Sequence, residues 1–151
     1  MKKSLIALIL LLIINSFAAA QGVDWIKEHY SKKDHRIQMR DGVTLFTSVY
    51  TPRDTTKLYP ILMVRTPYTI APYGEDQYPQ SLGPNDTFAR DGYIFVFQDV
   101  RGQFLSEGQF DNMRAYIPNK KKIKDVDETT DTYDTIEWLV KNLKFNNGNV
   151  G

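Results

Sequence analysis

Two continuous apolar runs constrain the fold of this chain more than any other feature of its sequence. Residues 61–64 read ILMV, and residues 93–97 read YIFVF. Short runs without polar alternation are typical of strands that are buried on both faces. Between them, residues 85–91 predict a short helix, with Asn85 or Asp86 as its cap and Gly92 as its stop. Buried strands that alternate with helices predict an α/β fold with a mostly parallel sheet.

A hairpin is predicted before the first of these strands. Residues 35–40 and 43–52 contain alternating or β-branched and aromatic side chains, and they flank the tight-turn pair Asp41-Gly42. This pattern predicts two antiparallel strands. Residues 21–33 are polar around Trp25 and predict a lead-in segment with a turn of helix.

The longest predicted helix spans residues 125–143. Acidic side chains lie at its start and lysines at its end, as the helix dipole favours. Apolar side chains at helical spacing predict its buried stripe: Tyr133, Ile136, Val140 and Leu143. Residues 146–148 then predict a turn, and residues 149–151 predict the start of another strand.

The first twenty residues have the order of a secretory signal peptide. A Lys2-Lys3 head precedes an apolar run over residues 5–14, and residues 18–20 are all alanine. The alternative, an uncleaved membrane anchor, is disfavoured because the apolar run is short for a span. We therefore expect cleavage before Gln21, no stable membrane span afterwards, and one further domain portion over residues 21–151.

Charge and cysteine content narrow the classes of partner and chemistry. The chain has 19 basic and 18 acidic side chains, and removal of the predicted signal peptide leaves 17 against 18. Without a basic excess, a nucleic-acid partner is not expected. The absence of cysteine excludes disulfides, zinc–thiolate sites and a cysteine nucleophile. An exported chain without disulfides is typical of a bacterial periplasmic or secreted enzyme.

Metal and cofactor sites find little support in the sequence. His29 and His35 are the only histidines, and with Asp34 they lie in a segment expected to be exposed. The acidic run at residues 125–136 lacks the glycine and the closing glutamate of a calcium loop, so we interpret it as a helix start. The chain also has no phosphate-binding glycine motif. We predict no cofactor and no metal.

Candidate catalytic residues follow the two predicted buried strands. Tyr68 comes just after the first strand, where α/β sheets bind ligands, and Pro67 restricts the backbone before it. Its hydroxyl could donate to a developing oxyanion, or its ring could simply pack under the loop. Asp99 and Arg101 end the second strand and could contact substrate, but a charge-assisted bond that ties down the long loop is favoured. Ser106 lies outside any G-x-S-x-G motif and is interpreted as loop structure.

Several of these segments together resemble one family. In order and at similar spacing, the chain contains MRDGVTL, VRTPY, FARDGYIFVFQDVRGQFLSEGQF, DTIEWL and NNGNVG. This combination resembles the CocE/NonD serine hydrolases, which include cocaine-esterase-like, α-amino-acid ester hydrolase and X-Pro dipeptidyl-peptidase-like enzymes. The resemblance implies an α/β-hydrolase fold and a Ser–Asp–His triad, and it implies that Tyr68 donates its hydroxyl to the oxyanion.

The resemblance also implies that the chain is incomplete as a catalyst. In the family, GNVG leads into G-x-S-Y-x-G, so the nucleophile, the acid and the histidine of the triad are expected beyond Gly151. We therefore expect an exported hydrolase of ester or amide and peptide bonds in its full-length form, and no activity from these 151 residues alone. The alternative is a truncated, non-catalytic exported binding module. Oligomeric state and substrate stay open, whether amino-acid ester, β-lactam amide or X-Pro peptide.

Overall fold

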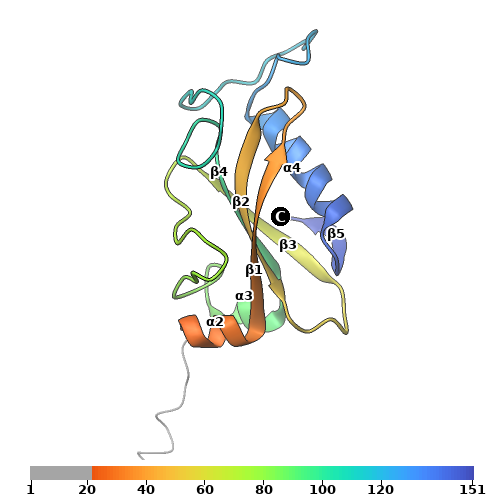
Figure 1. Cartoon of the computed structure of the whole chain (residues 1–151). Coiled ribbons are helices and arrows are strands. Elements are labelled where there is room, and N and C mark those ends of the chain that lie inside the picture. The colour runs from red at the N-terminus through yellow and green to blue at the C-terminus, as the bar shows by residue number, and fades with distance from the viewer. Residues whose placement is uncertain (1–21) are drawn as a thin grey trace, which may run out of the picture.

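A five-stranded mixed sheet forms the centre of the molecule (Figure 1). The computed structural model describes residues 22–151, so the predicted signal peptide lies outside the described residues. The strand order is β1-β2-β4-β3-β5, with bounds β1 Tyr30–Gln38, β2 Thr44–Pro52, β3 Tyr59–Thr66, β4 Ile94–Asp99 and β5 Asn146–Val150. The described helices are α2 Val23–His29, α3 Asp86–Asp91 and α4 Glu128–Asn142. Strand β3 pairs parallel with β4 and β5, whereas β2 pairs antiparallel with β1 and β4.

The two faces of the sheet carry separate apolar clusters. One cluster includes Ile37, Ile61 and Val96 and packs against Leu139 of α4. The other joins residues of the opposite face to α2 and α3: Ile26, Tyr30, Tyr50, Leu82, Ala89 and Phe95. Figure 1 shows the same arrangement, with α4 beside the sheet and the two short helices at its other end. Because side chains alternate between the two faces along each strand, the sheet contributes residues to both apolar clusters.

The predicted hairpin is confirmed, and it is longer than expected. Strand β1 begins at Tyr30, so the segment predicted as an exposed polar lead-in is helical only up to His29 and then joins the sheet. The turn at Asp41-Gly42 forms as predicted. The amide of Met39 donates to the carbonyl of Val43 at 2.8 Å, and Gly42 has a φ of 91° that a side chain would disfavour.

The two apolar runs form β3 and β4, but only β4 is buried on both faces. Val64 of β3 is 47% exposed, which contradicts the prediction for this strand. Ile61 packs in the cluster that contains Leu139 of α4, whereas Val64 belongs to neither apolar cluster. The short helix α3 is confirmed. Asn85 is its cap, accepting a hydrogen bond from the amide of Thr87 at 3.0 Å.

The long helix is confirmed, but its predicted buried stripe is only partly right, because Leu143 packs against the first apolar cluster whereas Val140 is exposed. The inward face of the helix holds Asp131, Thr135 and Leu139, whereas Tyr133 is 60% exposed. Compared with the prediction, the helix is rotated about its axis, because some of its polar residues have buried partners on the side that faces the sheet. Thr135 accepts a hydrogen bond from the Gln98 amide at 3.0 Å, and Asp131 pairs with an arginine that is described below.

The turn before β5 also lies earlier than predicted. Residues 144–145 form it, with Phe145 at a φ of 62°, and Asn146 already pairs with Tyr59. Strand β5 is irregular, and it pairs again at Val150, opposite Ile61, where the amide of the next residue, Gly151, donates to the carbonyl of Ile61 at 3.0 Å. Strand β5 thus runs beside β3 toward the edge where β3 ends. Within residues 22–151, no helix has the length and apolar character needed to cross a membrane.

Candidate active site

The carboxyl ends of the parallel strands β3 and β4 meet at one edge of the sheet. Thr66 and Asp99, the last residues of these strands, are paired across them. Tyr68 lies just beyond Thr66, and its amide donates to the Thr66 hydroxyl at 3.0 Å. Its side chain is 78% exposed. The predicted place of Tyr68 at this edge is confirmed, whereas the role of its hydroxyl stays a prediction.

Two cavities flank the segment that carries Tyr68. One, of about 250 Å³, is lined by side chains that include Val64, Thr66, Thr69 and Phe97. The other, of about 280 Å³, has Pro67 among its lining residues together with the loop around residues 110–113. Thr66 and Pro67, the two residues before Tyr68, thus each line a cavity at the edge where α/β sheets bind ligands.

Asp99 lies beneath this edge and holds a loop. Its side chain is fully buried and accepts a hydrogen bond from the Tyr73 hydroxyl at 3.0 Å. Burial raises the pKa of Asp99, although the hydrogen bond from Tyr73 opposes this shift. Of the two roles considered for this residue, the structure supports the tie to a loop, because Tyr73 belongs to the segment that follows Tyr68.

Arg101 is buried and joins three segments. Its guanidinium donates to both carboxylate oxygens of Asp131, at 2.9 and 2.7 Å, and to both of Asp41, at 2.8 and 3.1 Å. These hydrogen bonds, foremost those to Asp131, raise the pKa of Arg101. The favoured structural role of Arg101 is therefore confirmed. It connects the hairpin turn and helix α4 to the segment after β4.

Ser106 is interpreted correctly as loop structure. Its hydroxyl donates to the carbonyl of Asp99 at 2.6 Å and accepts from the amide of Phe46 at 2.8 Å. The neighbouring Glu107 accepts from the amide of Thr44 at 3.0 Å. Both residues attach the loop after β4 to strand β2, so the serine hydroxyl is committed to the backbone.

The two histidines lie apart from this edge and from each other. The ring of His29 stacks on Trp25 at 4.2 Å, and the ring of His35 lies 4.9 Å from that of Trp138. His35 is half-buried in β1 rather than exposed, and burial lowers the pKa of its ring. Among residues 22–151, no group of three or more metal-ligating side chains comes together.

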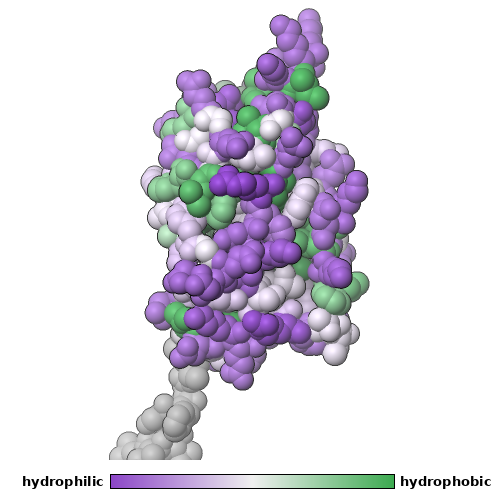
Figure 2. Space-filling view, in the orientation of Figure 1, coloured by the Kyte–Doolittle hydropathy of each residue, from purple (hydrophilic) through white to green (hydrophobic). Residues whose placement is uncertain are grey.

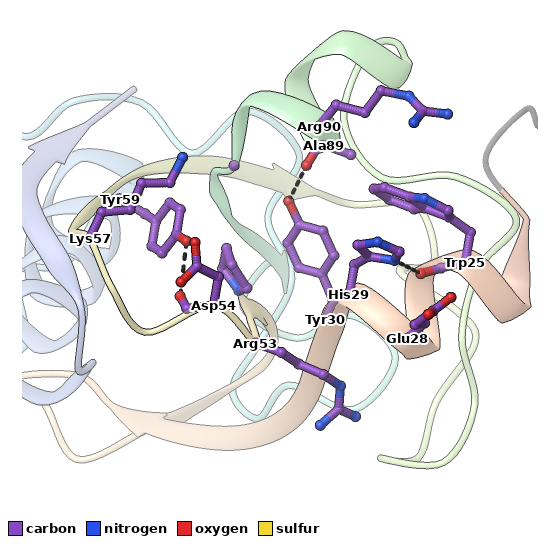
Figure 3. A pocket seen from close by; sticks show the side chains of 12 residues that line it. Trp25, Glu28, His29, Tyr30, Arg53, Asp54, Lys57, Tyr59, Ala89 and Arg90 are labelled. Atoms are coloured by element: carbon purple, nitrogen blue, oxygen red, sulfur yellow. Dashed lines mark hydrogen bonds between the residues drawn. The ribbon is translucent and has the colours of Figure 1, made fainter.

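A larger cavity, of about 500 Å³, lies at the other end of the sheet (Figure 3). It is placed near the amino ends of β3 and β4, away from Tyr68. Side chains around it already contact the protein itself. The hydroxyl of Tyr59 donates to the carbonyl of Asp54 at 2.9 Å, and the guanidinium of Arg90 lies 5.2 Å from the ring of Trp25. Because α/β sheets bind ligands at their carboxyl edge, Tyr68 marks the better candidate site.

Comparisons with known proteins show which family the chain belongs to and which fold it shares. Residues 41–151 match the family of X-Pro dipeptidyl-peptidases (S15 family). The cocaine esterase of Rhodococcus sp. (strain MB1 Bresler) is 37% identical over 117 residues, which are 76% of this chain and 17% of the esterase. The chain thus spans about a sixth of the length of this relative.

Solved structures match the fold as well. An aminopeptidase from a marine sediment archaeon, Thaumarchaeota archaeon, is 37% identical with a TM-score of 0.67, over 81% of this chain and 20% of the aminopeptidase. An α-amino acid ester hydrolase is 39% identical with a TM-score of 0.64, over 89% of this chain and 22% of the hydrolase. A CocE/NonD family hydrolase from Staphylococcus aureus, 24% identical with a TM-score of 0.55, shares the fold. The predicted fold class, the N-terminal part of an α/β-hydrolase fold, is confirmed.

Proposed function

We propose that this chain, which belongs to the X-Pro dipeptidyl-peptidase (S15) family, forms the N-terminal part of a serine hydrolase that cleaves ester or peptide bonds. In this proposal the nucleophilic serine, the acid and the histidine come from residues beyond Gly151. The protein that contains both parts is called the full-length enzyme below.

The observation that carries the proposal is the position of Tyr68 relative to β5. Tyr68 is exposed at the carboxyl edge of β3. Strand β5 runs parallel to β3, and the carbonyl of Gly151 accepts from the amide of Met63 at 2.9 Å. A chain that continues in this direction reaches the same edge within a few residues, because each strand residue advances about 3.3 Å. A serine on the turn after β5 would then face Tyr68.

The proposed chemistry is acyl transfer to water. The serine attacks the carbonyl carbon of the substrate, and the negative charge that develops on the carbonyl oxygen accepts a hydrogen bond from the Tyr68 hydroxyl. The histidine takes the proton of the serine hydroxyl during this attack and gives it to the leaving alcohol or amine as the bond to the carbonyl carbon breaks. Water, with its proton taken by the histidine, then attacks the acyl-enzyme, and the acid and the free serine are released. Residues 66–68 contribute to this by holding the phenol at the edge of the sheet before substrate arrives.

Two measurements test the proposal. The coding sequence downstream of Gly151 should continue in frame with G-x-S-Y-x-G within about ten residues. In the full-length enzyme, Tyr68→Phe should lower kcat by about a hundredfold or more, because one oxyanion donor is lost. The matched control is Tyr116→Phe, which removes the hydroxyl of another exposed tyrosine. An unchanged kcat in Tyr68→Phe would return Tyr68 to a packing role.

We also propose that the enzyme is exported, because residues 1–20 have the order of a signal peptide. N-terminal sequencing of the mature protein from the cell envelope or medium should begin at Gln21. Retention of Met1 in a cytoplasmic protein would contradict export without affecting the proposed chemistry.

A further inference from the structure

Lys32 of strand β1 is a buried cation that the proposed chemistry does not use. The residue is 6% exposed, and its ammonium donates to the carbonyls of Pro72 at 2.6 Å, Gly74 at 2.8 Å and Gln77 at 3.0 Å. An ammonium has three donors, so all of them are used on one loop. The nearest carboxylate oxygen, on Asp34, lies 3.9 Å away. The loop backbone is therefore the main replacement for water around this charge.

A second residue of β1 binds the same loop. Asp34 accepts a hydrogen bond from the amide of Gly74 at 3.2 Å, and the Ser48 hydroxyl donates to its other oxygen at 2.7 Å. The backbone amide of Lys32 also donates to the Tyr78 hydroxyl at 2.9 Å. Burial lowers the pKa of Lys32, and nearby carboxylates, first that of Asp34, oppose this shift. Burial of a charge is costly unless polar groups surround it, so the loop is held in the one conformation that directs its carbonyls at the ammonium.

The loop that Lys32 holds also carries Tyr68. Tyr73 lies between the carbonyls of Pro72 and Gly74 in sequence, and its hydroxyl donates to Asp99 at 3.0 Å. The Thr69 hydroxyl donates to the oxygen of Tyr73 at 3.2 Å and accepts from the amide of Ala71 at 3.0 Å. Hydrogen bonds, together with the backbone of residues 72–74, therefore connect the Lys32 ammonium to Thr69, the residue next to Tyr68.

We propose that Lys32 is a positioning residue, whose ammonium fixes residues 66–77 so that the Tyr68 hydroxyl faces the reacting carbonyl oxygen. This inference rests on the proposed function of Tyr68. Because Tyr68 itself is exposed, its place depends on the backbone that carries it, and a displacement of about 1 Å at an active site can cost about a hundredfold in rate.

The test is a double-mutant cycle in the full-length enzyme, with kcat and KM measured on folded protein. Lys32→Met should lower kcat by about ten- to a hundredfold with KM changed less than about threefold, because an interaction of the transition state is weakened. Combined with Tyr68→Phe, the same change should lower kcat less than about threefold further, because residues that act as a unit are not additive. Lys33→Met, on the exposed side of the same strand, is the control and should keep the wild-type kcat.

Chemical rescue provides a readout that is independent of the cycle. Lys32→Ala leaves the three carbonyls without their donor, and n-propylammonium has the length and charge of the missing part of the side chain. It should raise kcat, whereas neutral 1-propanol at equal concentration should not. If the Lys32 variants do not fold, Tyr73→Phe is the alternative, because it removes only the hydroxyl that donates to Asp99 in the same loop. It should show the same loss of kcat and the same non-additivity with Tyr68→Phe.

The outcomes separate this inference from the proposed function. A loss of kcat in Tyr68→Phe with wild-type kcat in Lys32→Met overturns the inference and leaves the proposed function standing. Losses that multiply in the double variant also overturn it, because Lys32 would then act independently of Tyr68. An unchanged kcat in Tyr68→Phe overturns the proposed role of Tyr68, and the inference with it.

Discussion

Replacement of Arg101 by methionine should destabilise the protein more than any single change at its surface. The arginine is buried and makes charge-assisted hydrogen bonds to Asp41 and Asp131. The side chain of Asp131 is 1% exposed, so removal of the guanidinium leaves a buried carboxylate without its counter-charge. Breaking a buried pair in this way costs about 3–5 kcal/mol. The urea midpoint of unfolding should fall accordingly, because it equals the free energy of unfolding divided by its urea dependence.

The assay is equilibrium urea unfolding of the full-length enzyme, followed by loss of esterase activity. Arg40→Met is the matched control. Arg40 also forms a bidentate pair between the hairpin turn and α4, with Asp134 at 2.6 Å, but its side chain is 34% exposed. Because this pair is only partly buried, its loss should cost less than the loss of Arg101. Equal midpoint shifts in the two variants would refute the reasoning, because burial would then not decide the cost.

Two further predictions concern the start of α4 and the loop after β4. Burial works to raise the pKa of Asp127, but hydrogen bonds from the amide of Ile117, from Lys120 and from the amide of Thr130 lower it to about 2. The ionised carboxylate of Asp127 should therefore stabilise the fold fully above its usual pKa of 3.8, and this stabilisation should be lost as the pH falls toward 2. In the full-length enzyme, Asp127→Asn should make the melting temperature depend less on pH over this range. Equal slopes of melting temperature against pH in the variant and the wild type would contradict this prediction. Ser106→Ala should lower stability by about 1–3 kcal/mol, because the Phe46 amide loses its acceptor. Its kcat should stay within about twofold, and a loss of a hundredfold would instead place Ser106 in the chemistry.

Much of the fold could be predicted from the sequence because local rules and the final packing agree. The hairpin follows from Asp41-Gly42, and helix α3 begins and ends where its cap and its glycine indicate. The position of Tyr68 follows from the end of an apolar run, which fixes where β3 stops. Each of these features depends on residues that are close together in the sequence and not on distant contacts.

The exposure of the outer surface could not be predicted in the same way. The apolar run in β3 is only half-covered by the described residues, although its composition is that of a fully buried strand. Figure 2 shows one face of the molecule as largely hydrophilic, with hydrophobic areas that are small and separate. Whether a residue such as Val64 is exposed depends on which segments pack against it in space, and the sequence pattern does not contain this information.

Two of the wrong or missed predictions share one physical cause, which is a buried polar group with a distant partner. The stripe of α4 was misplaced because Asp131 faces inward toward Arg101, and Lys32 gave no sign of burial because its carbonyl partners lie on another loop. Hydrophobic periodicity assigns such residues to the surface, since a lone charge is rarely buried. In this protein, the exceptions lie around the edge that carries Tyr68. Arg101 and Lys32 each fix a segment near the carboxyl ends of β3 and β4. Departures from the local pattern are expected where function requires a backbone to be held in place.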